Sequence, residues 1–247
     1  MGSIYSETME LRSPGCDMHG AWKPGAILET MQETAGVHST LFGLGRDEMG
    51  RLGLGWVISR LKVEFDRVPQ VGERVIVETY PTPNRHLFFP RSHIFRDAQG
   101  GRLGAAHTLW LVMDLETRRM VKSEEVLAKI PENADMKPAA GMPGTVRPLD
   151  GEVKSSVIVP QFTDLDSNGH VNNTKYLDWC LNALGMEIMR EKCVTGFEAN
   201  YDAELRLGDE LRTELTMQGD FFAFCGLSGD RRRFSIGGRL GNRQRVK

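Results

Sequence analysis

The residues best suited to proton chemistry lie in one short polar stretch at positions 162–179. Acidic, amide and imidazole side chains are concentrated there, and in chain order they are Asp164, Asp166, Asn168, His170, Asn172 and Asn173. The run contains Gly169 and has no helical apolar period, which predicts a shaped loop. An imidazole beside carboxylate and amide groups could move a proton and hold a polarised carbonyl oxygen. The pattern therefore favours acid–base chemistry on a carbonyl compound.

A helix is predicted directly after this loop, over about 173–191, because apolar residues recur at helical spacing from Tyr176 to Ile188. If the loop is extended, Asp166, Asn168 and His170 would project to one side. The unpaired N–H groups and positive dipole end of the helix could then hold a developing oxyanion. Read alone, the same residues also fit a capped helix behind a solvated acidic loop, so both interpretations stay open at this point.

The longer string Asp-Leu-Asp-x-Asn-x-His-Val-Asn-Asn-x-x-Tyr-x-x-Trp, from Asp164 to Trp179, closely resembles the signature of the acyl-acyl carrier protein thioesterases. Members of that family release fatty acids from their carrier protein and contain two hotdog domains in one chain. The segment 103–122 also resembles the family's first-domain strand, which ends in a Thr-Arg-Arg hairpin. The resemblance implies the same activity, with acyl carrier protein as the partner that delivers the fatty acyl chain.

The resemblance also implies the catalytic residues Asp166, Asn168, His170 and Glu204. Glu204 follows an aromatic residue, Tyr201, by three positions, as a catalytic glutamate does in that family. We expect Glu204 to activate a water or attack the carbonyl itself, and Asn168 and His170 to hold the carbonyl oxygen. Asp166 would fix the loop and the imidazole. Whether Glu204 or His170 takes the proton stays open, but Leu205 excludes the cysteine nucleophile that some members could offer there.

An internal repeat supports a two-domain organisation. Each half reads as a strand, a polar loop, a long helix and four strands, in the same order. Asp17-Met-His-Gly parallels Asp166-Ser-Asn-Gly, and Val71-Gly-Glu-Arg-Val parallels Leu207-Gly-Asp-Glu-Leu. We therefore predict an α+β fold of two tandem hotdog domains, each a long helix wrapped by an antiparallel sheet. The N-terminal domain would span 1–130 and the C-terminal domain 152–247, joined by a proline- and glycine-rich linker at 131–151.

The predicted elements can be placed along the chain from period and turn signals. A helix at 26–42 would be followed by a glycine-rich connection at 43–55. The predicted strands lie at about 4–12, 57–65, 73–81, 86–96, 103–114, 153–160, 196–205, 209–218, 220–227 and 231–240.

The two halves differ in their polar residues. In the alignment of the two halves, Ala21 occupies the position equivalent to His170, and Val68 occupies the position equivalent to Glu204. We therefore expect one active site per chain, in the second half. The first half would be free to line an acyl tunnel, with its apolar helix face and strand 57–65 as walls.

Composition bounds the other possibilities. The chain has 247 residues, 40% hydrophobic and 26% charged, with a net charge of −2, which is ordinary for a soluble globular protein and points to neither nucleic acid nor an anionic membrane. Its four cysteines lack metal-ligand spacing, and thiolate is a good leaving group, so no metal or cofactor is expected. No membrane span, secretory signal or transit peptide is visible, which favours a cytoplasmic bacterial relative of the plant enzymes. A homodimer is possible.

Two questions stay open at this level. The carrier protein is acidic in the resembled family, so docking would use basic groups, and the candidates are Arg118, Arg119 and Lys122, or Arg231 to Arg233. The alternatives to a carrier-protein thioesterase are an acyl-CoA thioesterase of the same fold and a non-catalytic acyl-binding protein.

Overall fold

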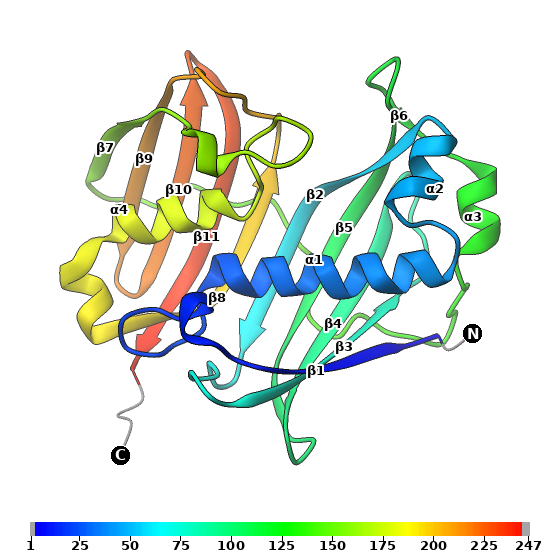
Figure 1. Cartoon of the computed structure of the whole chain (residues 1–247). Helices are drawn as coiled ribbons and strands as arrows, with labels where there is room; N and C mark the ends of the chain where they lie inside the picture. Colours follow the sequence, from blue (N-terminus) through cyan, green and yellow to red (C-terminus); the bar gives the residue numbers. More distant parts are fainter. Residues whose placement is uncertain (1–2, 244–247) are drawn as a thin grey trace.

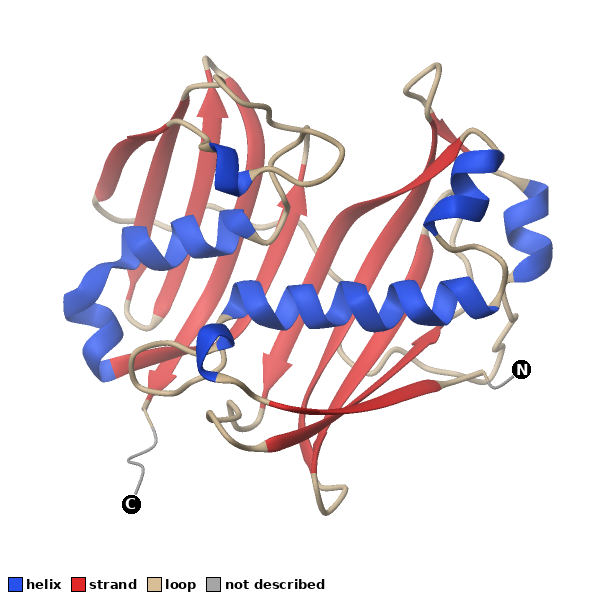
Figure 2. Ribbon diagram, in the orientation of Figure 1, coloured by secondary structure: helices blue, strands red, loops and turns tan. Residues whose placement is uncertain are grey.

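The computed structural model describes residues 3–243, and one antiparallel sheet of eleven strands runs through all of it (Figures 1 and 2). The strand order is β1-β3-β4-β5-β2-β8-β11-β10-β9-β7, and β6 pairs with β5. The strands of the first half are β1 (Tyr5–Glu10), β2 (Leu54–Phe65), β3 (Arg74–Pro81), β4 (Phe89–Asp97), β5 (Arg102–Asp114) and β6 (Met120–Val121). Those of the second half are β7 (Val153–Ile158), β8 (Lys192–Tyr201), β9 (Leu211–Gln218), β10 (Phe221–Ser228) and β11 (Arg231–Asn242).

The two long helices, α1 (Pro24–Leu41) and α4 (Lys175–Glu191), lie on the same face of this sheet, one over each half (Figure 2). Pro24 suits the first turn of α1 because its missing N–H is not needed there. The helix buries Ile27, Leu28 and Met31 against the strands. Two short helices, α2 (Arg46–Arg51) and α3 (Glu124–Lys129), cover the outer end of the first half.

The two halves repeat the same strand order, as the sequence repeat predicts. Reading outward from the centre, β2-β5-β4-β3-β1 corresponds to β8-β11-β10-β9-β7. The halves join where β2 and β8 pair in antiparallel fashion, with Leu61 opposite Ala199, both fully buried. The outward strand residues Lys62 and Glu64 alternate with the buried Leu61, Val63 and Phe65, since successive strand side chains face opposite sides.

Two predicted boundaries were wrong in ways that affect the site. The glycine-rich connection at 43–55 contains α2, which brings Arg46 to the second half's polar loop. The predicted strand 196–205 ends at Tyr201, because Asp202 and Ala203 turn back to donate their backbone N–H groups to Arg233 O. Glu204 therefore lies in the turn beyond β8 and not in the strand itself.

The segment 131–151 forms no helix or strand and passes behind the sheet, opposite the helices (Figure 1). Its backbone is held by strand side chains. Ala139 N donates to Ser92 Oγ at 3.0 Å, and Val146 N donates to Asn200 Oδ1 at 2.8 Å. The domain limits of 1–130 and 152–247 remain a prediction.

The start of α1 and the start of α4 meet closely. A side chain on Gly25 would place its Cβ 2.8 Å from Asp178 Oδ1 and 3.3 Å from Thr174 O, so glycine allows this approach without a shift of Asp178. Two turns further along α1, Gln32 and Asn173 exchange two side-chain hydrogen bonds, at 2.9 and 3.1 Å. The first half's helix is thereby fixed against the polar loop of the second half.

Candidate active site

The polar loop folds as a tight turn built on Asp166 rather than as an extended segment. The carboxylate oxygen Oδ1 of Asp166 accepts hydrogen bonds from the backbone N–H groups of Asn168, at 2.8 Å, and His170, at 3.2 Å. Its backbone N–H donates to His170 O at 2.7 Å, and Gly169 takes a positive φ of 76° that glycine adopts without strain. Asp166 therefore shapes the backbone of the loop, and its bond to His170 reaches the backbone N–H and not the imidazole. Its role in holding the imidazole stays a prediction.

The first half contains the same turn without an imidazole or carboxylate in the places of His170 and Glu204. Asp17 Oδ1 accepts from the N–H groups of His19 and Ala21, at 2.9 and 3.0 Å, as Asp166 does for Asn168 and His170. The turn then pairs with the segment beyond it in the same way: Trp22 N donates to Pro69 O, as Val171 N donates to Leu205 O. The residues in the places of His170 and Glu204 are Ala21 and Val68, both buried and apolar.

The structure brings His170 and Glu204 together. His170 Nε2 lies 3.3 Å from Glu204 Oε2, with the imidazole 17% and the carboxylate 37% exposed. Arg118, from the hairpin between β5 and β6, forms an ion pair with the same carboxylate oxygen. Arg206 Nη2 lies 3.4 Å from His170 Nε2. The glutamate is thus held between an imidazole of its own half and a guanidinium of the other half.

Asn168 lies beside this pair with its amide held on both sides. Its Nδ2 donates to Asp166 Oδ2 at 3.3 Å, and its Oδ1 accepts from Arg46 Nη2 at 3.3 Å. Arg46 also donates to Ser167 Oγ at 2.9 Å. Because an amide nitrogen has two N–H groups, Asn168 keeps one donor besides the bond to Asp166.

The start of α4 does not contribute the donors that the sequence suggested. The N–H of Thr174 donates to Asn172 Oδ1, that of Lys175 to Asn172 O, and that of Leu177 to Thr174 O. These N–H groups are occupied by hydrogen bonds within the loop and the first turn, and none of these residues lines the cavity described next.

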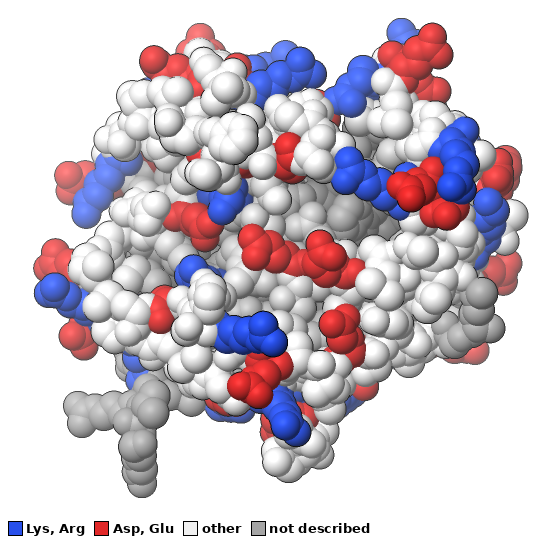
Figure 3. All heavy atoms as spheres, viewed as in Figure 1, with Lys and Arg blue, Asp and Glu red and all other residues white. Residues whose placement is uncertain are grey.

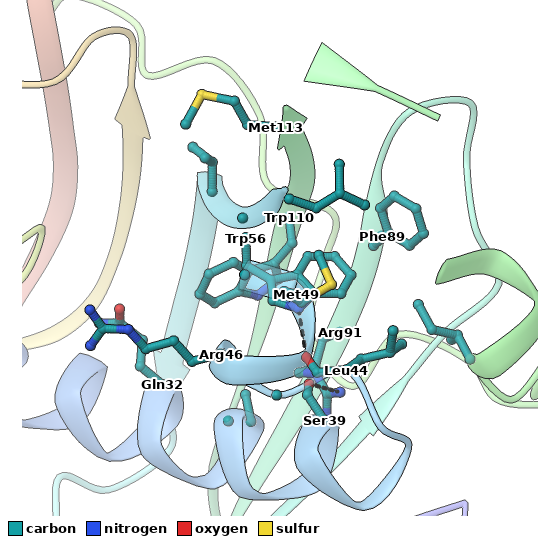
Figure 4. Close-up of a pocket in the computed structure, with 18 of the residues that line it drawn as sticks. Gln32, Ser39, Leu44, Arg46, Met49, Trp56, Phe89, Arg91, Trp110 and Met113 are labelled. Carbon is teal, nitrogen blue, oxygen red and sulfur yellow. Dashed lines mark hydrogen bonds between the residues drawn. The ribbon is translucent and has the colours of Figure 1, made fainter. Parts of the chain in front are cut away.

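A cavity of about 730 Å³ opens from the His170–Glu204 pair into the first half. Asn168, His170 and Glu204 line its second-half side. Its remaining wall is mostly apolar, and Figure 4 shows the residues that converge on it from α1, α2 and strands β2, β4 and β5. They include Leu44, Met49, Trp56, Phe89, Trp110 and Met113. Of the predicted wall strand 57–65, only Val57 lines the cavity, because the later residues of β2 pack under α1 in the core.

One charged residue lies deep in this cavity, which sequence reasoning missed. Arg91, on β4, is 8% exposed and contacts Thr79 Oγ1 at 3.2 Å and Ser39 Oγ at 3.4 Å. Burial lowers the pKa of its guanidinium to about 10. Its place between the apolar residues Phe89 and Phe95 of a predicted strand gave no signal, since only the strand's register decides which face Arg91 occupies.

Metal and thiol chemistry find no support here. The residues that the structure describes contain no group of three histidine, cysteine or acidic side chains placed to hold a metal ion. Burial strongly raises the pKa of the Cys180 thiol, on α4. A neutral buried thiol is a poor nucleophile, so Cys180 acts as a core residue, as its helical position predicts.

The repeated turn provides a matched pair of variants. We expect Asp166→Ala to lower kcat/KM by about 10²-fold, because two backbone N–H groups lose their acceptor and the residues they place no longer align. Asp17→Ala removes the same two bonds in the first half and also an ion pair with Arg243 at 2.8 Å. It should lower the unfolding temperature while kcat/KM of the folded protein stays within a few-fold. Equal losses of kcat/KM in the two variants would contradict this assignment.

Comparison with known proteins gives consistent matches over most of the chain. Residues 2–130 match the family model of the acyl-ACP thioesterase N-terminal domain, and residues 149–224 match that of the C-terminal domain. The chain is 27% identical to the chloroplastic palmitoyl-acyl carrier protein thioesterase of Arabidopsis thaliana, over 93% of this chain and 59% of that protein. It is 26% identical to the chloroplastic dodecanoyl-[acyl-carrier-protein] hydrolase of Umbellularia californica, over 88% and 60%. The chain thus spans little more than half the length of these plant relatives.

Two solved structures share the whole architecture. An acyl-ACP thioesterase from Bacteroides thetaiotaomicron superposes with a TM-score of 0.87 at 22% identity, covering 97% of this chain and 98% of that one. The 12:0-ACP thioesterase from Umbellularia californica gives a TM-score of 0.84 at 23% identity, covering 98% and 99%. These likenesses confirm the predicted α+β fold of two tandem hotdog domains. Within residues 3–243, no helix has the length and apolar character that crossing a membrane needs.

Proposed function

Because the chain belongs to the acyl-ACP thioesterase family, we propose that it hydrolyses the thioester of fatty acyl-acyl carrier protein and releases the free fatty acid. The observation that carries this proposal is the single cavity that joins the His170–Glu204 pair to an apolar space in the first half. A thioester carbonyl at the pair would leave its acyl chain in the apolar space and its carrier arm toward solvent.

Glu204 is the group best placed to drive the attack. Its carboxylate is ion-paired with Arg118 and contacts His170, so it is held at the cavity entrance rather than turning freely in water. It would take a proton from a water that attacks the carbonyl carbon, or attack that carbon itself. In either case the carbon–sulfur bond breaks and the carrier leaves as a thiol after gaining a proton. Direct attack would leave the acyl group on Glu204 as a mixed anhydride, and a water would then hydrolyse it to release the fatty acid and restore the carboxylate. A positioned base of this kind typically accelerates a reaction by about 10²–10⁴-fold.

The donors beside Glu204 would stabilise the charge that builds on the carbonyl oxygen. Asn168 has one amide N–H left for this oxygen, and the imidazole of His170 lies at the same side of the cavity. Losing one such donor commonly costs about 10²–10³-fold in rate. Asp166 would act on both at once, because its carboxylate holds the backbone N–H groups of Asn168 and His170.

The carrier protein would dock around the cavity mouth, where arginines from both halves lie. Arg46 and Arg118 line the cavity itself, and Arg232, at the start of β11, pairs with Asp202 near the same turn. Figure 3 shows Lys and Arg interspersed with Asp and Glu on this face, without a broad area of one sign. Docking would therefore depend on a few arginines at the mouth. Of the docking residues predicted from the sequence, Arg118 is the one beside Glu204. Lys122, just after β6, instead pairs with Glu124 at the start of α3.

The test is hydrolysis of matched acyl-carrier protein and acyl-CoA thioesters of increasing chain length, with release of free thiol as the readout. We expect the carrier-protein thioesters to give the higher kcat/KM at every productive length. A clear preference for CoA would instead assign the chain to acyl-CoA hydrolysis. Tight binding of acyl chains with no thiol release from either series would identify a non-catalytic acyl-binding protein.

A further inference from the structure

The deep end of the cavity contains a cation that the proposed reaction does not use. Arg91 is 8% exposed, and it lines the same cavity as His170 and Glu204. The only acidic residue among the described residues that line this cavity is Glu204, which is held at the entrance by Arg118. The guanidinium at the deep end therefore has no carboxylate to balance it.

The groups that Arg91 contacts are two side-chain hydroxyl oxygens and one imidazole nitrogen. Its Nη1 lies 3.1 Å from His38 Nδ1 and 3.2 Å from Thr79 Oγ1, and its Nη2 donates to Ser39 Oγ at 3.4 Å (Figure 4 draws the last of these). A guanidinium has five N–H donors in a fixed plane. Burial is the cause of its lowered pKa, with no carboxylate nearby to oppose the shift. The three contacts use three of these donors, so the remaining N–H groups can meet an acceptor that enters the cavity.

The position of Arg91 relative to the reacting groups follows from α1. The side chain of Gln32 is hydrogen-bonded to Asn173 of the polar loop, and that of Ser39 is hydrogen-bonded to Arg91. Gln32 and Ser39 both line the cavity. They are seven positions apart in α1, so the part of the cavity beside Gln32 and the part beside Ser39 lie about 10 Å apart along the helix axis. An acyl chain with its carbonyl at Glu204 would therefore bring its far end, and not its reacting end, toward Arg91.

We propose that Arg91 makes this cavity selective for acyl chains that carry a hydroxyl or carboxylate oxygen at the end remote from the thioester. This inference rests on the proposed thioester hydrolysis and names the chemical class of its substrate. An oxygen at that end would accept a hydrogen bond from the guanidinium, while the methylene chain packs against Trp56, Phe89 and Trp110. A methyl end would offer the guanidinium no further acceptor.

The expected selectivity is large enough to measure. A hydrogen bond to a charged group commonly changes binding by about tenfold to a hundredfold. We expect ω-hydroxy or ω-carboxy acyl-carrier protein thioesters to exceed methyl-ended thioesters of equal length by at least about tenfold in kcat/KM, at the length that reaches Arg91. Arg91→Met should abolish this preference, and Arg91→Lys should retain part of it. Arg96→Met is the matched control, because Arg96 is on the same strand but pairs with Glu78 and does not line the cavity.

A binding measurement on the unaltered protein keeps the test independent of folding and of catalysis. Methyl esters of saturated fatty acids of increasing length and of their ω-hydroxy counterparts, which carry no free carboxylate, would be compared by the rise in unfolding temperature that each produces. A larger rise with ω-hydroxy esters supports the proposal even if no thioester is hydrolysed, in which case only the proposed function fails. Equal or smaller rises at every length, together with efficient hydrolysis of methyl-ended thioesters, would overturn the role of Arg91 and leave the proposed function standing.

Discussion

Glu204→Gln should reduce kcat/KM for acyl-carrier protein thioesters by about 10²–10⁴-fold, the usual contribution of a positioned base. The amide of glutamine has the size of the carboxylate and can still contact Arg118 and His170. It neither accepts a proton at neutral pH nor attacks a carbonyl. The loss corresponds to roughly 3–5 kcal/mol of transition-state stabilisation, at about 1.4 kcal/mol for each tenfold change. It should fall mainly on kcat, because the acyl chain still binds in the first half.

The variant should remain folded. Glu204 is 37% and Arg118 42% exposed, and partly exposed ion pairs of this kind contribute about 0–1 kcal/mol to folding. Circular dichroism and the unfolding temperature would check this. Glu210→Gln is the matched control, since Glu210 is exposed in the same loop and does not line the cavity. A Glu204→Gln protein with kcat/KM close to that of Glu210→Gln would remove Glu204 from the mechanism.

The sequence predicted most of the fold because the two long helices and the longer strands have strong local signals, which the short helices α2 and α3 and the strand β6 lack. The alternation of Leu61, Val63 and Phe65 with charged residues is retained in β2, and the apolar period that contains Ile27, Leu28 and Met31 became the buried face of α1. The repeat predicted which strands correspond, and the identical turns at Asp17 and Asp166 follow from it. What local signals could not give was the pairing of β2 with β8, which joins the halves into one sheet.

The sequence indicated the part of the candidate site that lies within one turn, but not the contacts that cross between the two halves. Asp166, Asn168 and His170 are close in sequence, so one turn can place them. The contacts that cross between the halves, such as Arg118 with Glu204 and Arg46 with Asn168, depend on how β5 and α2 are arranged against the second half. Arg46 was not singled out, because a charged residue in a glycine-rich segment reads as solvated. The helix-end donors were assigned wrongly, because sequence does not reveal that Asn172 accepts hydrogen bonds from the backbone N–H groups of Thr174 and Lys175.

His170→Ala should lower kcat/KM by about 10²–10³-fold, the usual effect of removing one group that stabilises charge on the carbonyl oxygen. The first half shows why this variant should fold: Ala21 occupies the equivalent place, and its backbone N–H still donates to the turn aspartate at 3.0 Å. The substitution therefore removes the imidazole while the turn keeps its backbone bonds. Single-turnover kinetics with acyl-carrier protein, compared at several pH values, would measure the loss.

The reverse exchange in the first half tests whether the turn alone is sufficient. Ala21→His should not restore activity to a His170→Ala protein, because Val68 is 6% exposed and offers no carboxylate where Glu204 stands in the second half. The imidazole would also meet an apolar core in place of the cavity, since Ala21 is 4% exposed. Wild-type rates in His170→Ala, or recovery in the double variant, would contradict a single site built from both halves. We therefore expect the duplicated turn to act as a scaffold, with the chemistry depending on the side chains that only the second copy carries and on the arginine that the first half supplies to them.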